Sequence, residues 1–136
     1  MLKLFISSHG KLASGIISSV NILMGNSEKI TWFDAYIDEK SVQEALDEFY
    51  KGISAEDQVI LLSDLYGGSV NSTMFLYLDK PNTVLVSGYN LALIIELAVR
   101  DEFISKEELN ELITNSKEMM MIVDKNEEKK IEDDFF

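Results

Sequence analysis

The sequence contains no cysteine and only one histidine and one proline in 136 residues. The absence of cysteine excludes disulfides and thiolate metal sites, and it is typical of the reducing cytoplasm. No apolar run approaches the length of about 20 residues that a bilayer-crossing helix needs. The N-terminus also lacks the basic segment and cleavage site of a signal peptide. We therefore expect a cytoplasmic protein.

Basic residues are scarce as well. The chain has 12 Lys and Arg against 24 Asp and Glu, which gives a net charge of −12. Binding to nucleic acid needs clustered basic side chains, so we expect no nucleic-acid partner. The charge favours solubility and encounters with a basic protein surface. With 46% hydrophobic residues, the chain has enough apolar side chains for one core.

The apolar pattern alternates between the strand period and the helix period. It predicts strands over residues 2–6, 30–37, 59–62 and 83–86, and helices over residues 12–24, 41–51, 69–78, 90–100 and 105–117. Right-handed crossovers between such strands specify an α/β fold. We expect a doubly wound open sheet of four parallel strands, in the order 2-1-3-4, flanked by helices.

The C-terminal part departs from this alternation. Met119–Val123 is a short apolar run that predicts one last strand, at the edge of the sheet. Residues 125–136 form a charged tail, apart from two terminal phenylalanines. Since we find no linker and no internal repeat, we expect one domain over residues 1–124.

His9, the only histidine, is expected to follow the first strand. Gly10 comes next, and a helix is predicted to begin near Leu12. Open α/β sheets bind ligands at the carboxyl ends of their strands, close to helix N-termini. A histidine packed in the core is the ordinary alternative. The position of His9 between a predicted strand and a glycine favours a functional imidazole over one packed in the core.

Asp64 ends the third strand as His9 follows the first, and the order 2-1-3-4 makes these strands neighbours. A carboxylate facing an imidazole can accept one ring N–H, fix the tautomer and leave the other nitrogen as a nucleophile. An Asp after a buried strand is also common as a helix cap or loop residue. The sequence pattern alone leaves both roles open.

Gly67, Gly68 and Ser69 follow Asp64 closely. Two glycines allow backbone N–H groups to approach an anion, and the next helix adds its positive end. The spacing is not that of a nucleotide-binding P-loop, but it suits one phosphoryl group. An ordinary tight turn is the alternative. Ser69 or Asn71 is the expected cap of the next helix.

Together, these residues predict transfer of a single phosphoryl group through phosphohistidine. One histidine with scattered carboxylates does not supply a typical zinc site. The Gly-x-Ser-x-Gly motif of serine hydrolases and the Gly-x-Gly-x-x-Gly motif of dinucleotide-binding proteins are absent. We therefore expect a phosphotransferase that needs no metal and no cofactor.

The residues resemble those of the mannose-type EIIA component of the bacterial phosphoenolpyruvate-dependent sugar phosphotransferase system, in the mannose/fructose/sorbose family. The resemblance extends from residue 1 to about residue 124. It rests on three motifs, which are Ser8-His9-Gly10 with Ala13 and Gly15, Ser63-Asp64-Leu65-Tyr66-Gly67-Gly68-Ser69 with Asn71, and Ser87-Gly88-Tyr89-Asn90.

This resemblance implies specific roles. His9 would receive the phosphoryl group from phospho-HPr and pass it to an EIIB component, for sugar uptake through the membrane components EIIC and EIID. Asp64 would be the acidic partner of His9. Gly67, Gly68 and Ser69 would face the phosphate.

The resemblance also implies a homodimer, in which the strand at Met119–Val123 crosses to the partner subunit. An exposed apolar strand would otherwise invite edge pairing, although the run could instead cover its own sheet edge. Two positions depart from the family, because Val70 and Ala92 stand where it often has proline. Proline pre-sets a loop or a first helical turn, so we expect looser loops there with the chemistry intact.

Two other functions stay open at this point. The phosphotransfer subunit that serves dihydroxyacetone kinase shares the fold and the early histidine, but typically lacks Tyr-Gly-Gly-Ser after the third strand. A regulatory module of the same fold would use the crevice for binding only. Tyr66, beside the crevice, is either a partner contact or a packing residue. The sequence identifies neither the sugar nor the phosphorylated ring nitrogen.

Overall fold

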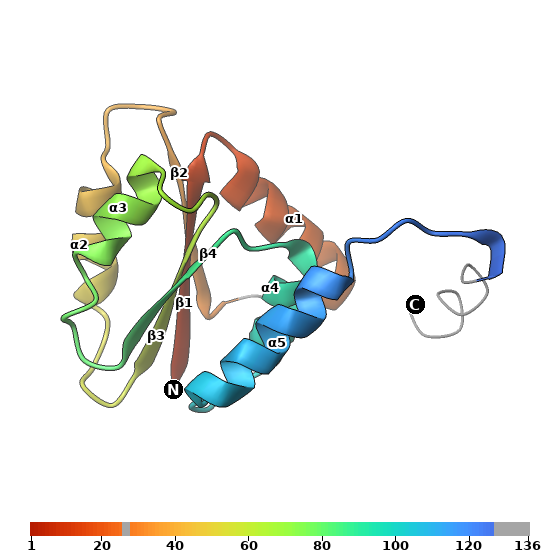
Figure 1. Ribbon diagram of the computed structural model, residues 1–136. Coiled ribbons are helices and arrows are strands. Elements are labelled where there is room, and N and C mark those ends of the chain that lie inside the picture. The colour runs from red at the N-terminus through yellow and green to blue at the C-terminus, as the bar shows by residue number, and fades with distance from the viewer. Residues whose placement is uncertain (26–27, 127–136) are drawn as a thin grey trace.

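The computed structural model describes residues 1–25 and 28–126. Its four strands are all parallel and follow the order β2-β1-β3-β4. The predicted doubly wound α/β sheet is therefore confirmed (Figure 1). In chain order, the elements are β1 (Leu2–His9), α1 (Leu12–Met24), β2 (Ile30–Ala35), α2 (Val42–Tyr50), β3 (Gln58–Ser63), α3 (Ser69–Phe75), β4 (Thr83–Ser87), α4 (Leu91–Ala98) and α5 (Lys106–Glu118).

Helices cover both faces of the sheet. Figure 1 shows α2 and α3 on one side and α1, α4 and α5 on the other. Side chains of β1 alternate between the two resulting cores: Leu4 and Ile6 pack with α1, α4 and α5, and Phe5 packs with α2 and α3. All six residues of β3 are buried, which explains why its sequence is a continuous apolar run.

Three helices begin with the side-chain caps that their sequences favour. Ser41, Asn90 and Ser105 each accept a hydrogen bond from the backbone N–H three residues later, at 2.9–3.1 Å. The cap at Ser105 is the one that its Ser-Lys-Glu-Glu pattern predicts. None of the helices within the described residues is long and apolar enough to cross a membrane.

Helix α3 begins differently. Its N-cap is Gly68, which has no side chain to accept a bond, so the predicted cap by Ser69 or Asn71 is wrong. Both side chains are engaged elsewhere. The Asn71 amide oxygen accepts hydrogen bonds from Ser63 (2.7 Å) and from Ser87, at the carboxyl ends of β3 and β4. The Ser69 hydroxyl lies in the site described below.

The strand predicted at Met119–Val123 is not formed within the described part of the single chain, and its pairing with a partner subunit is not tested there. Helix α5 ends at Glu118, and the run that follows pairs with none of the described strands. Figure 1 shows the chain leading away from the sheet after α5. Its side chains are 44–95% exposed. The run has no sheet edge beside it, so it neither forms a strand nor covers its own sheet. The predicted tail lies outside the described residues beyond residue 126.

Candidate functional site

His9 and Asp64 meet at the carboxyl edge of the sheet. β1 and β3 are hydrogen-bonded neighbours, with Ser7 opposite Ser63. His9 is the last residue of β1, and Asp64 follows β3 directly. The Oδ2 atom of Asp64 lies 2.9 Å from the backbone nitrogen of His9 and 2.9 Å from its ring Nδ1. The topology thus brings together the two residues that carried the sequence hypothesis.

This contact determines the tautomer of His9. An ionised carboxylate only accepts hydrogen bonds, so Nδ1 carries the proton and Nε2 keeps a free lone pair. The His9 side chain is 42% exposed, whereas that of Asp64 is 11% exposed. A mostly buried carboxylate therefore orients an imidazole that remains accessible from solvent. Such an arrangement suits a nucleophile that another protein must reach.

Ser69 and Tyr36 complete the surroundings of the imidazole. The Ser69 hydroxyl lies 3.3 Å from Nε2 and is hydrogen-bonded to the Tyr36 hydroxyl. The Tyr36 ring stacks on the imidazole, with centroids 5.4 Å apart and planes inclined by 23°. Sequence reasoning placed Tyr36 inside a strand and missed it. One sequence feature could have identified it: Tyr36 lies at the carboxyl end of β2, and β2 pairs with β1 on the side away from β3.

The glycine loop lies directly against the imidazole. A Cβ on Gly68 would stand 3.2 Å from Cε1 of His9, which is tighter than ordinary van der Waals contact. Gly67 has a φ of 80°, in the left-handed region that favours glycine. The Gly68 N–H donates to the Leu65 carbonyl at 3.2 Å. The Gly68 N–H is therefore engaged within its own loop.

Hydrogen bonds between buried polar groups hold the segments that carry the site residues in place. Asn71 links β3, β4 and α3 through its amide oxygen. The buried Ser8 hydroxyl accepts from the Ala13 N–H at 2.8 Å and fixes the turn behind His9. Burial, and then the charge of Asp64, raise the pKa of the Tyr89 hydroxyl, so this side chain stays neutral beneath the site. Tyr66, in contrast, is 84% exposed, so the packing interpretation is wrong for it.

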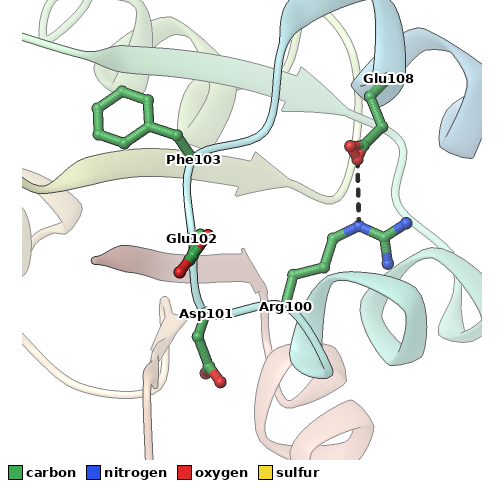
Figure 2. Close-up of a pocket in the computed structure, with 5 residues that line it drawn as sticks. All are labelled: Arg100, Asp101, Glu102, Phe103 and Glu108. Atoms are coloured by element: carbon green, nitrogen blue, oxygen red, sulfur yellow. Dashed lines mark ion pairs between the residues drawn. The ribbon is translucent and has the colours of Figure 1, made fainter.

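A hollow lies at the end of the sheet opposite His9. Figure 2 shows its lining, in which Arg100 Nε and a Glu108 carboxylate oxygen are 3.7 Å apart. The Asp101 carbonyl accepts from the backbone N–H of Leu2, where β1 begins. Because His9 ends the same strand, this hollow is separate from the site around His9. Within residues 1–25 and 28–126, no group of three or more metal-ligating side chains is present.

Comparison with known proteins places this geometry in a family. Residues 3–117 match the family model of the fructose IIA component of the phosphotransferase system, EIIA-man. The fructose-specific EIIA component of Bacillus subtilis (strain 168) is 24% identical over 133 residues, which cover 95% of this chain and 91% of that protein. The mannose-specific EIIAB component of Escherichia coli (strain K12) is 25% identical over 113 residues, 79% of this chain. This chain spans about a third of that relative, with 35% of its length aligned.

A solved structure shows the same architecture. It belongs to a candidate permease of the phosphoenolpyruvate-dependent sugar phosphotransferase system from Klebsiella pneumoniae subsp. pneumoniae. It superposes with a TM-score of 0.79 at 30% identity, covering 92% of this chain and 93% of that chain. The family match includes every residue that surrounds His9. The chain therefore belongs to the mannose/fructose EIIA family of the sugar phosphotransferase system.

Proposed function

We propose that this protein carries a phosphoryl group on Nε2 of His9. The donor is phospho-HPr and the acceptor is an EIIB component, which works with membrane EIIC and EIID components in coupled sugar uptake and phosphorylation. The observation that carries the proposal is the contact between Asp64 and Nδ1, at 2.9 Å. It leaves Nε2 as the nucleophilic nitrogen, on a ring that is 42% exposed. The protein would act in the cytoplasm, where a donor protein and an acceptor protein both reach it.

The reaction is an in-line exchange between two imidazoles. The Nε2 lone pair attacks phosphorus, and the bond from phosphorus to the donor nitrogen breaks. The donor imidazole, protonated on its other ring nitrogen, leaves neutral with that electron pair. The proton on Nδ1 stays in place, and the Asp64 carboxylate stabilises the positive charge that develops on the His9 ring. The Ser69 hydroxyl, 3.3 Å from Nε2, is in reach of a phosphoryl oxygen. Since the donor is already a phosphohistidine, the residues present account for the step without a metal or a nucleotide.

Exposed apolar side chains flank the site in the sequence and suit a protein partner. Leu12, Ile37 and Leu65 are 51–59% exposed. Leu12 is the first residue of α1, and the other two lie on the loops that follow β2 and β3. Exposed apolar side chains commonly become buried at the centre of protein interfaces. We propose that these residues contact the donor and the acceptor in turn.

We also propose a homodimer. Met119–Val123 presents five consecutive apolar side chains to solvent, with Met120 at 87% and Ile122 at 95% exposed. Such a segment is a liability in a monomer. In the proposed dimer, the run adds to the sheet of the partner subunit and becomes a strand only there.

The test uses purified protein and ³²P-labelled phospho-HPr. We expect one acid-labile label per chain in the wild type and none in His9→Ala, since His9 is the only histidine. Circular dichroism of His9→Ala checks that it folds. Label that persists in this variant would contradict the proposal. Onward transfer to a mannose-type EIIB, and not to a dihydroxyacetone kinase subunit, separates the proposed function from its alternative in the same assay.

A further inference from the structure

We propose that Tyr36 is a positioning residue for phosphoryl transfer. In this role its ring fixes the plane of the His9 imidazole, and its hydroxyl holds the Ser69 hydroxyl beside Nε2. The inference rests on the proposed function, because positioning has a purpose only if Nε2 reacts. It assigns a function to a residue that the sequence motifs of the site do not include.

The contacts of His9 come from the loops that follow β2 and β3 and from the first residue of α3. Asp64 binds the Nδ1 edge, and Ser69 lies 3.3 Å from Nε2. Gly68 approaches Cε1. Tyr36 supplies the remaining contact, with its ring 5.4 Å from the imidazole between centroids. Without that ring, the described contacts hold the imidazole at its edges alone.

The backbone of Tyr36 supports a functional role. Its φ is 66°, a left-handed conformation that is uncommon for a bulky aromatic residue. Its side chain is 67% exposed, so the hydrophobic core gains little from it. A turn alone would favour glycine or asparagine here. An aromatic side chain in an unfavourable backbone conformation, exposed and touching two site residues, is typical of a functional position.

The hydroxyl of Tyr36 has a different effect from the ring. With Nδ1 protonated, Nε2 is an acceptor, so Ser69 donates to it and accepts from Tyr36. When the phosphoryl group arrives, Nε2 must give up that bond, and the Ser69 proton turns to a phosphoryl oxygen. Tyr36 still donates to the Ser69 oxygen throughout. It therefore keeps this oxygen in place while Ser69 changes its acceptor, with no net transfer of a proton.

The first experiment needs no phosphoryl donor. The two ring nitrogens of the single histidine are followed by ¹⁵N NMR at alkaline pH in Tyr36→Phe and Tyr36→Ala. We expect Tyr36→Phe to shift Nε2 and leave Nδ1 nearly unchanged, because only the Ser69 contact loosens. Tyr36→Ala should shift both resonances. The matched control is Tyr66→Ala, which changes a still more exposed tyrosine with no described ring contact to His9 and should shift neither resonance.

The second experiment measures transfer from phospho-HPr over a range of donor concentrations. We expect Tyr36→Phe to lower the rate at saturating donor about tenfold with KM unchanged, less than the roughly hundredfold loss when a direct donor to a transition state is removed. The double variant Tyr36→Phe/Ser69→Ala should transfer no more slowly than the single variant Ser69→Ala, because the Tyr36 hydroxyl acts through Ser69.

Each outcome decides the proposal. A rise in KM with an unchanged saturated rate would make Tyr36 a docking residue and overturn it, as would unchanged ¹⁵N shifts in both Tyr36 variants. Wild-type protein that accepts no label refutes the proposed function instead. The NMR arm distinguishes the two failures, because it reports on the position of the imidazole without any reaction.

Discussion

The Oδ2 atom of Asp64 accepts two hydrogen bonds from His9, one from its backbone N–H and one from its ring Nδ1–H, both at 2.9 Å. The backbone bond ties the end of β1 to the loop after β3. The ring bond determines which imidazole nitrogen is free. A single carboxylate oxygen therefore sets both the position and the tautomer of the histidine, and this dual role can be tested by substitution.

Removing the carboxylate should slow transfer without unfolding the protein. We expect Asp64→Ala to lower the single-turnover rate of labelling from phospho-HPr by about 10²-fold or more. Asp64→Asn keeps an acceptor oxygen but loses the charge, so its transfer rate should lie between those of the wild type and Asp64→Ala. The control is Asp79→Asn, which makes the same chemical change in the exposed turn after α3 and should leave the transfer rate unchanged. An unchanged rate in Asp64→Ala would refute the orienting role.

The two glycines of the loop should respond differently to alanine. Gly68 has a φ of −76°, which alanine adopts readily, but the new Cβ would stand 3.2 Å from the imidazole. We expect Gly68→Ala to keep its stability to within about 0.5 kcal/mol and to lose transfer rate. Gly67→Ala meets no atom within 4 Å yet imposes a φ of 80° on alanine, so it should cost about 1–2 kcal/mol of unfolding free energy.

Urea unfolding and single-turnover labelling of the same two preparations check this pair. The effect of Gly68→Ala should appear in the rate, and that of Gly67→Ala should appear first in the unfolding midpoint. A Gly68→Ala variant that transfers at the wild-type rate would show that the loop moves away from His9 in the reacting complex.

The strand order and the meeting of His9 with Asp64 were predictable, because both follow from the alternation of strands and helices. Right-handed crossovers place the carboxyl ends of parallel strands at one edge. Tyr36 was not predictable in the same way. The alternating pattern of residues 30–37 continues past Ala35, and a tyrosine gives no signal of the left-handed φ that ends the strand.

The C-terminal run and the start of α3 differ in the single chain from their sequence patterns for another reason. Met119–Val123 has the composition of a strand, but a strand also needs an edge to pair with, and α5 carries the chain away from both edges. Ser69 and Asn71 have the composition of helix caps, but tertiary contacts with His9 and Ser63 engage them instead. In both cases the deciding partner is distant in sequence or lies outside this chain.

The proposed dimer can be tested by light scattering. We expect the wild type to show twice the 15.4 kDa of one chain. Replacing Met120 and Ile122 by Asp should give monomers, since charges cannot be buried in a sheet interface without partners. Ile22→Asp, which changes an apolar residue on α1 that is 82% exposed, is the control and should stay dimeric. A monomeric wild type at all concentrations would refute the dimer.

The alkaline limit of stability should depend on Tyr77. This side chain is buried, and its hydroxyl donates to Asp47 Oδ1. Burial, followed by the hydrogen bond and charge of Asp47, raises the pKa of Tyr77 to about 12. In the unfolded chain a tyrosine ionises near pH ~10. Between these values the unfolded state releases a proton that the folded state keeps, so the free energy of unfolding falls as the pH rises.

Tyr77→Phe removes this contribution and keeps the ring. We expect the variant to be less stable than the wild type at about pH 8, by about 1 kcal/mol for the lost hydrogen bond. The difference should shrink toward about pH 11, where only the wild type is losing stability through this group. Burial also raises the pKa of Tyr50, so the variant should still lose some stability in alkali. Urea unfolding at a series of pH values measures both curves, and parallel curves would show that Tyr77 is not the group responsible.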